Sequence, residues 1–395
     1  MNAASRSDSM RGGGRATGGP SGEAGPEAVA AAETRAPVRV RRFGLPWAGK
    51  SSGDSRQLAL LRYLVIRLFL ILPTAWILVT VVFFLMRVIG DPISAAMGGR
   101  MTQEQIEVRK EAAGLNRPIL TQYWEYISGL MHGDFGHSQD NRQISEVVTT
   151  YGAATLELVF WALLVAFAVG VPLGRYAATH RDSTADAGLR LFAVLAYAAP
   201  VFFVGLLLKL IFAVKLEWLP VAGRASTSVE LQLQHVSPKT NIMVIDAILY
   251  GDSGYLIDVL KHAILPAVAL GLLTAGIFLR LVRVNLIQTL RSEFVDAARA
   301  RGLSARVVTG RHAVRNAMIP IITVMGMYIA TMLGGAVLTE TTFEWKGLGY
   351  QLAEYLHQRD FIAVQGIVAF LALAVAVISF LVDAIVALID PRVRF

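Results

Sequence analysis

The stretch EFVDAARARGL, residues 293 to 303, brings acids, arginines, paired alanines and a glycine together between two apolar segments. Glu293 and Asp296 occupy the first turns of a predicted short helix, and Arg299 and Arg301 occupy its last turn. This charge order complements a helix dipole, so the helix should form. The charges of this stretch could recognise a partner protein or a lipid head group electrostatically.

Small residues beside these charges suggest two uses for the stretch. Gly302 suits the left-handed conformation that ends a helix, and Ser304 is a candidate N-cap for a second short helix over residues 305 to 313. Ala297 and Ala298 give the first helix a face with little bulk, which would let another protein's groove approach its backbone. A basic amphipathic segment could equally lie among anionic lipid head groups. Spacing alone leaves both alternatives open.

Ionisable residues inside the apolar runs are the second group that could do chemistry. A proton- or sodium-coupled carrier usually needs a carboxylate near the middle of a span, and none lies there. The ionisable side chains near the span ends are expected to snorkel to the interface or to contact another helix. They are Arg87, Glu157, Lys209, Glu340 and Asp383.

Histidines offer no metal site in this sequence. No pair has the tight spacing of metal ligands, and the chain has no cysteine that could supply thiolates. We therefore expect no resident metal. The histidines considered are His132, His137, His235, His262, His312 and His357.

Composition identifies the elements that must position these residues. Hydrophobic residues make up 54% of the 395 residues and charged residues 17%, well below the charged share of about 25% in soluble domains. The net charge of +8 does not indicate nucleic acid, because the arginines gather between apolar runs. The chain is predicted to be an all-α integral membrane protein.

Six apolar runs reach the length of a membrane-spanning helix. The fourth is expected to be the shortest, since Pro266 lies near its start and Arg280 ends it. The runs cover residues 68 to 90, 154 to 174, 189 to 213, 263 to 280, 317 to 338 and 362 to 388.

The distribution of arginine predicts the orientation. The segment from Arg280 to Arg315 holds eight arginines against two acids, whereas the connection from 91 to 150 carries more acids than bases. Basic loops stay on the inner side of a membrane. Both termini and the 280 to 316 loop are therefore predicted to be cytoplasmic.

Residues 103 to 136 of the acidic outer segment are amphipathic and carry an apolar stripe at helical spacing. The stripe could pack on the membrane surface or on the outer mouth of the bundle. Alternatively, the outer segment and the turn at 343 to 350 could dock a partner protein. The residues of the stripe are Tyr123, Trp124, Tyr126, Ile127, Leu130 and Met131.

The run EFVDAARARGLSARVVTGRHAVRNAMIP closely resembles the EAA-type loop of permease subunits in bacterial ATP-binding-cassette importers, and in particular the oligopeptide, dipeptide and nickel branch. Where the general motif ends in Ile-x-Leu-Pro, this chain has His312 to Arg315, with a proline only at Pro320, and this variant itself resembles that branch. The likeness covers nearly everything after residue 58. It includes GLNRPILTQYWEYISGLMHGDFGHS, ATLELVF, WLPVAG, GGAVLTETTFEWKGLGYQL and DPRVRF.

The resemblance implies a type I ABC importer permease fold, in a multi-pass protein of the bacterial cytoplasmic membrane, that does no bond chemistry of its own and has no catalytic residue and no cofactor. Residues 58 to 150 would be the first span with an extracytoplasmic segment, and 151 to 395 the transmembrane domain with a coupling loop at 281 to 316. The resemblance does not cover residues 1 to 57, whose Gly, Ala, Pro, Glu and Arg content predicts a disordered cytoplasmic tail. The resemblance also implies a second permease, two cytoplasmic ATPases and an extracytoplasmic substrate-binding protein as partners, besides membrane lipid. The residues it implies for ATPase coupling are Glu293, Asp296, Ala297, Ala298, Arg301, Gly302, His312 and Arg315.

The substrate class implied by the resemblance is a peptide. A nickel or glutathione importer of the same family is an alternative. A six-span secondary carrier with a lipid-binding loop, and a membrane scaffold that recruits partners through its tail, are the alternatives from other classes.

Overall fold

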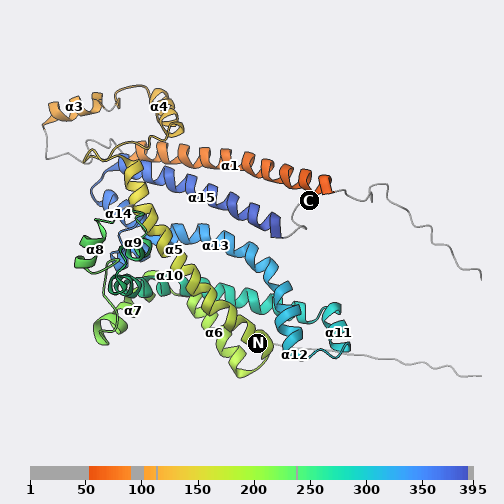
Figure 1. Ribbon diagram of the computed structural model, residues 1–395. Helices are drawn as coiled ribbons and strands as arrows, with labels where there is room; N and C mark the ends of the chain where they lie inside the picture. The colour runs from red at the N-terminus through yellow and green to blue at the C-terminus, as the bar shows by residue number, and fades with distance from the viewer. Residues whose placement is uncertain (1–52, 90–101, 113, 237–238, 390–395) are drawn as a thin grey trace, which may run out of the picture. The chain divides into compact units, whose positions relative to one another are not determined.

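The computed structural model describes residues 53–89, 102–112, 114–236 and 239–389. Regular structure in these ranges is helical, apart from one isolated bridge between His137 and Gln143. The predicted all-α class is confirmed (Figure 1). The predicted tail lies outside the described residues, except for residues 53 to 57, which already belong to the first helix.

Five helices are long and apolar enough to cross a membrane in the described part of the chain. They contain the first, second, fourth, fifth and sixth predicted runs. The proline inside each of α1, α5, α10 and α13 is accommodated because neighbouring helices can re-satisfy freed backbone groups. The five are α1 (Gly53–Ile89), α5 (Ile144–Thr179), α10 (Ser253–Leu290), α13 (Val314–Phe343) and α15 (Phe361–Ile389).

The third predicted run is not one straight helix. α6 (Thr184–Ala198) ends before Pro200, and α7 (Val201–Leu208) leaves at an angle of 105° and continues as a π-helical turn, η2 (Lys209–Lys215). Pro200 has no backbone N–H to donate into α6 and adopts an extended conformation at the start of α7. The described residues therefore hold five spans, or six if this bent pair counts as one.

The expectation that the fourth span would be the shortest was wrong. α10 has 38 residues, and Pro266 and His262 lie buried within it. This helix packs against α5, α6, α7, α9 and α13, so protein surrounds most of it. Such surroundings stabilise a proline and buried polar groups that would be unfavourable in a helix facing lipid.

α5 and α10 approach each other so closely that only glycine fits at several positions. A Cβ atom on Gly170 would lie 2.7 Å from Cβ of Phe278, and one on Gly174 would lie 2.7 Å from the carbonyl oxygen of Leu279. From the other side, a Cβ on Gly271 would lie 2.5 Å from the carbonyl oxygen of Ala162. Small residues at such contacts let helix backbones meet, which is a main source of packing energy between membrane helices.

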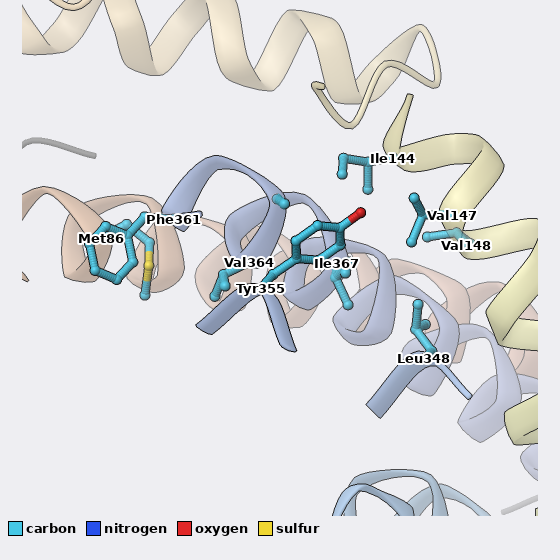
Figure 2. Close-up of a cluster of buried hydrophobic side chains, with 10 residues drawn as sticks. Met86, Ile144, Val147, Val148, Leu348, Tyr355, Phe361, Val364 and Ile367 are labelled. Atoms are coloured by element: carbon cyan, nitrogen blue, oxygen red, sulfur yellow. The ribbon is translucent and has the colours of Figure 1, made fainter. Parts of the chain in front are cut away.

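Shorter helices gather at one end of the bundle, which we call the α4 end (Figure 1). A buried apolar cluster joins the start of α5 to α14 and α15 there; it includes Ile144, Val147, Leu348, Tyr355 and Ile367 (Figure 2). The short helices are α3 (Gln103–Ala112), α4 (Ile119–Met131), α8 (Thr227–Leu233), α9 (Met243–Tyr250) and α14 (Leu348–His357).

The opposite end, which we call the α11 end, carries the connection between α10 and α13. α11 (Glu293–Ala300) comes first, followed by α12 (Ala305–Val307) and a π-helical stretch, η3 (Val308–Ala313). η3 runs directly into α13, so the chain is helical without a break from Ala305 to Phe343. The separate second short helix expected over residues 305 to 313 is in fact the beginning of a span.

The close contact between α5 and α10 predicts opposite effects of the same substitution at two glycines of α5. Gly174→Ala must force the helices apart, and overpacking of this kind costs about 1–3 kcal/mol of stability. Gly152→Ala adds a methyl group with no atom within 4 Å and should be neutral or stabilising, because alanine favours a helix over glycine. Thermal unfolding in detergent, followed by tryptophan fluorescence, compares the two; equal midpoints would contradict the close contact.

Candidate functional site

α11 is amphipathic, and its inner face packs on the bundle. Val295 is fully buried and Ala298 nearly so, in an apolar cluster with Leu286, Val308 and Ala313. Val295 and Ala298 are three residues apart and therefore lie on one side of the helix. η3 and α10 supply the surface on which α11 rests.

The pair of alanines does not form one exposed face, contrary to the sequence-based prediction. Ala298 is only 8% exposed and packs inward, whereas Ala297 is exposed. The physical reason is the helical period, because adjacent residues on an α-helix point about 100° apart and cannot share a narrow stripe. Ala298 is thus a core residue in this chain, and of the pair only Ala297 presents its side chain to the surroundings.

The exposed side of α11 combines apolar and charged groups. Phe294 is 44% exposed and shares a face with Ala297 and Arg301, which follow it at helical spacing. Leu303, 39% exposed, lies in the turn that follows. We call these four residues the α11 surface. Glu293 and Asp296 are exposed beside it, and Asp296 pairs with Arg299 at 3.2 Å.

Gly302 ends the helix as predicted. Its φ is +77°, a left-handed value that glycine adopts without strain. Ser304 precedes α12, but its hydroxyl makes no capping hydrogen bond; its carbonyl oxygen instead accepts from the amides of Val307 and Val308 at 3.0 Å.

The remaining predicted coupling residues lie on the helical run that begins at α12. His312 is half-buried in η3, and Arg315 is exposed in the first turn of α13. α11 packs on η3, so the predicted residues come from two adjoining elements. The structure therefore brings all eight predicted residues to the α11 end, seven of them at least partly exposed and Ala298 alone buried.

Sequence reasoning did not foresee the buried polar network at the α4 end. Glu340 is fully buried, so it does not snorkel but makes the alternative predicted contact with another helix. Its carboxylate accepts a hydrogen bond from the Thr155 hydroxyl at 2.7 Å and one from the Tyr350 amide at 2.8 Å. Thr155 accepts in turn from the Leu348 amide at 2.8 Å. A Cβ on Gly347 would lie 2.4 Å from this carboxylate, so the turn before α14 is wrapped around Glu340.

A second buried carboxylate, Glu157, holds the start of α9. It accepts hydrogen bonds from the amides of Met243 and Val244, both at 3.0 Å, and pairs with Arg224. A carboxylate at a helix N-terminus satisfies amides that have no partner inside the helix. The Arg224 guanidinium also lies over the ring of Trp345, 5.5 Å from its centroid.

The other three ionisable residues of the spans also have partners within the protein. Arg87 donates to Gln122 and Gln365, the latter at 3.0 Å. Lys209 donates to the carbonyl oxygen of Thr342 at 2.9 Å. The Asp383 carboxylate pairs with Arg67 at 3.2 Å.

The outer apolar stripe packs partly on the bundle. Tyr126 of α4 stacks on Phe83 of α1, and Tyr123 meets the same ring edge-on; burial raises the pKa of Tyr126 to about 12. Trp124 and Met131 belong to the same predicted stripe but are 65% and 82% exposed. The stripe is therefore divided between two faces of α4.

Docking of a partner protein was one of the two alternatives for the turn at 343 to 350, and most of this turn is buried. Phe343, Trp345 and Leu348 are at most 2% exposed. Glu344 and Lys346 are the exposed residues of the turn. The buried part of the turn is held to α5, because Trp345 donates its ring N–H to the carbonyl oxygen of Ala154 at 2.9 Å.

Among the residues described, no group of three His, Asp or Glu side chains could hold a metal ion.

Two family models together match the chain from residue 60 to its last residue. Residues 170–395 match "Binding-protein-dependent transport system inner membrane component", and residues 60–170 match the N-terminal model of the same transport systems. The chain belongs to this family. It is a non-catalytic, multi-pass permease of the inner membrane, and membership implies binding-protein and ATPase partners.

The permease aligns with curated relatives over nearly the whole length of those relatives. It is 37% identical to the di/tripeptide transport system permease protein DppB of Pseudomonas aeruginosa, over 85% of this chain and 99% of that protein. The dipeptide transport system permease protein DppB of Escherichia coli gives the same values. The glutathione transport system permease protein GsiC of Escherichia coli is 30% identical over 85% of this chain and 100% of that protein.

A solved structure is also similar to this permease. It is described as inward facing conformations of the MetNI methionine ABC transporter. The TM-score is 0.45 at 15% sequence identity, with 62% of this chain and 96% of that chain covered.

The two alanines of α11 should respond differently to enlargement. Ala298→Leu places three extra carbon atoms in a packed cluster and should cost about 1–3 kcal/mol of stability. Ala297→Leu places the same atoms on an exposed face and should change stability by less than about 0.5 kcal/mol. Thermal unfolding midpoints in detergent measure both, and a larger loss in Ala297→Leu would show that the faces are assigned wrongly.

Loss of the Glu157 carboxylate should release α9. Glu157→Ala leaves Arg224 buried without its partner, and breaking a buried pair in this way costs about 3–5 kcal/mol. Amides at 241 to 250 should then exchange with deuterium at least about a hundredfold faster. Glu230→Ala removes the exposed pair with Lys346 at 3.4 Å and is the matched control, expected to leave that exchange nearly unchanged. Unaltered exchange in Glu157→Ala would show that Glu157 does not hold the start of α9.

Proposed function

We propose that this permease forms half of the translocation pathway of an ATP-driven importer of short peptides. The observation that carries the proposal is the 37% identity to two peptide permeases, across 99% of each relative. Similarity at this level spans the bundle as well as the α10–α13 connection, so it concerns the pathway and not one motif. The peptides are proposed to be dipeptides or oligopeptides.

We further propose that α11 docks on a cytoplasmic ATPase subunit. Support comes from the α11 surface, where Phe294 and Leu303 are exposed beside Arg301 at the end of a connection rich in arginine. Exposed apolar residues rimmed by charges are typical of protein interaction sites. This arrangement requires the α11 end and both termini to face the cytoplasm, as the distribution of basic residues predicts.

The same proposal gives the long helix after Gly302 a role. α11 packs on η3, and η3 continues into α13 without a break. A displacement of α11 by the ATPase would therefore act on a membrane span directly. Glu293, Asp296, Ala297, Arg301 and Gly302 would form or shape the contact, with His312 and Arg315 beside it, while Ala298 would hold α11 on the bundle.

A second permease and an extracytoplasmic substrate-binding protein complete the proposed assembly. The α4 end would then face the binding protein, and Trp124 and Met131 are the exposed apolar residues of α4 that such a partner could cover. A glutathione importer is the second candidate, supported by 30% identity to GsiC. Glutathione is itself a short peptide, so both candidates need a pathway for a small zwitterion.

The proposal is tested with the complete transporter in sealed vesicles. Wild type should take up a labelled dipeptide only when ATP is present, and excess unlabelled dipeptide should compete better than glutathione or a nickel salt. Ala297→Trp combined with Asp296→Arg should lower uptake and binding-protein-stimulated ATP hydrolysis together by at least about tenfold, because bulk and reversed charge block the docking face. Trp124→Ala, at the α4 end, is the control for ATPase capture and should co-purify with the ATPase as wild type does.

Two results would contradict the proposal separately. Dipeptide uptake without ATP, or better competition by nickel or glutathione, would overturn the substrate or the class of transporter. Normal ATPase capture and hydrolysis by the double variant would remove α11 from the docking site while leaving the substrate class intact.

A further inference from the structure

A cavity of about 820 Å³ lies between α6, α10 and α13. Its walls are mainly apolar, with Tyr197 on α6 and Tyr328 on α13 as polar exceptions. Cavities of this size hold small ligands whole, and their few polar groups fix the orientation of the ligand. The charged residues that line it are Arg190, Arg280 and Arg283, and no carboxylate is among the lining residues of the described chain.

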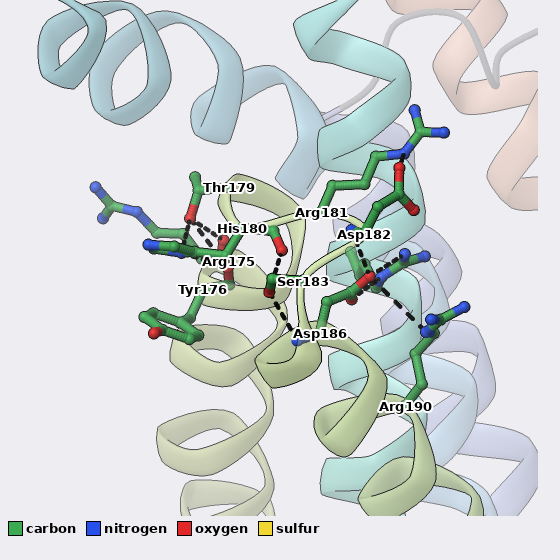
Figure 3. A network of polar contacts seen from close by, with 10 residues as sticks. Arg175, Tyr176, Thr179, His180, Arg181, Asp182, Ser183, Asp186 and Arg190 are labelled. Atoms are coloured by element: carbon green, nitrogen blue, oxygen red, sulfur yellow. Dashed lines mark hydrogen bonds and ion pairs between the residues drawn. The ribbon is translucent and has the colours of Figure 1, made fainter.

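One of these arginines is fully engaged by the protein. Arg283 donates two hydrogen bonds to Asp186, at 2.6 and 2.7 Å, in a bidentate pair. Asp186 is completely buried behind the cavity wall and also accepts from the Asp182 amide at 3.1 Å. Figure 3 shows the contacts around Asp186 and the side chain of Arg190 reaching toward it. The Asp186 carboxylate therefore neutralises Arg283 and has little capacity left for a second cation.

The other two arginines keep their charge available to the cavity. Arg190 comes within 3.8 Å of the Asp186 carboxylate, but its side chain remains 53% exposed. Arg280 is exposed and forms no hydrogen bond or ion pair with any residue that the structure describes. Two of the three guanidinium groups thus share the Asp186 carboxylate, and the third has no partner there. An unpaired guanidinium at the wall of a largely apolar cavity can fix the orientation of an anionic ligand.

Close contacts between helices fix the walls of the cavity around Arg280. α6 and α10 touch at Gly276, where a Cβ would lie 2.7 Å from the carbonyl oxygen of Ala193. Tyr328 is held edge-on against Phe278, with ring centroids 6.2 Å apart. The cavity therefore has fixed walls on three sides, and the guanidinium of Arg280 is its one fully unpaired charge among the described residues.

We propose that this cavity binds the C-terminal carboxylate of the transported peptide, with Arg280 as the direct ligand and Arg190 as a supporting cation. The inference rests on the proposed function, because peptide import supplies a small ligand with one carboxylate and apolar side chains. A guanidinium matches a carboxylate in shape and charge. The phosphate of an anionic lipid shares this chemistry and is the competing source, which the test separates.

The test measures import of labelled alanyl-alanine and of its C-terminal amide by the complete transporter. The ratio of the two rates reports recognition of the carboxylate, and any preference of the binding protein cancels when variants are compared. Arg280→Gln should lower this acid-to-amide ratio by about tenfold or more, since a charge-assisted hydrogen bond is lost. Arg280→Lys keeps the charge and should stay within about threefold of wild type.

Controls separate this inference from folding, coupling and lipid binding. Arg62→Gln removes an exposed arginine from α1, outside the cavity, and should leave the ratio unchanged. ATP hydrolysis stimulated by the binding protein should stay near the wild-type rate in Arg280→Gln. The measurements are repeated in vesicles of phosphatidylcholine alone and with phosphatidylglycerol added.

An unchanged acid-to-amide ratio in Arg280→Gln would overturn the inference. So would a loss of uptake that appears only with phosphatidylglycerol, because Arg280 would then hold a lipid. Equal slowing of both peptides together with ATP hydrolysis would also overturn it, since Arg280 would then act on coupling. Absence of any dipeptide uptake by wild type is a separate result that refutes the proposed function itself and this inference with it.

Discussion

Backbone contact between α5 and α10 is the constraint on which the other packing depends. Gly170, Gly174 and Gly271 leave no room for side chains, so two of the long helices of the described chain lie in close contact with each other. α6, α7 and α13 then pack on α10, while α14 and α15 pack on α5. Apolar side chains gain little by leaving lipid for protein, so close packing of this kind must supply much of the stability.

Buried carboxylates fasten the shorter segments to this pair of helices. Glu340 holds the turn before α14, Glu157 holds α9, and Asp186 holds α6 to α10 through Arg283. Each has its oxygens occupied by amides, hydroxyls or guanidinium groups. A carboxylate saturated in this way stabilises a fixed geometry and is poorly suited to relay protons. That agrees with a transporter whose energy comes from a partner protein.

The features that could be predicted from the sequence are those specified by a local pattern of residues. The apolar runs predicted five of the long helices, and the charges of Glu293 and Arg299 with Gly302 predicted α11 and its end. Composition and motif together predicted the family. Among the candidate site residues, the position of the α10–α13 connection at one end of the bundle followed from the runs on either side of it.

The rest depends on contacts between distant segments. Pro266 suggested a short fourth span, yet its helix is long because five neighbours surround it. In the sequence, Glu340 lies near the end of a predicted span. Its burial follows from the turn from Gly347 to Tyr350, which packs around its carboxylate only in the folded chain. Ala297 and Ala298 are chemically identical, so no local signal states which one packs on Val308. The 105° bend at Pro200 likewise needs the spatial arrangement, since Pro73 and Pro172 occur inside helices that continue past them.

The unbroken helix from Ala305 to Phe343 has a mechanical consequence. Its 39 residues span up to about 58 Å, and it is bounded at both ends by left-handed residues, Gly302 and Glu344, where the chain changes direction. Over that length a tilt of about 5° at one end of a helix displaces the other end by up to about 5 Å. The helix is joined to Thr155 of α5 through Glu340 at one end and to α10 and α11 through Val308 and Ala313 at the other, so a small rotation at either end would strain the contacts at the opposite one.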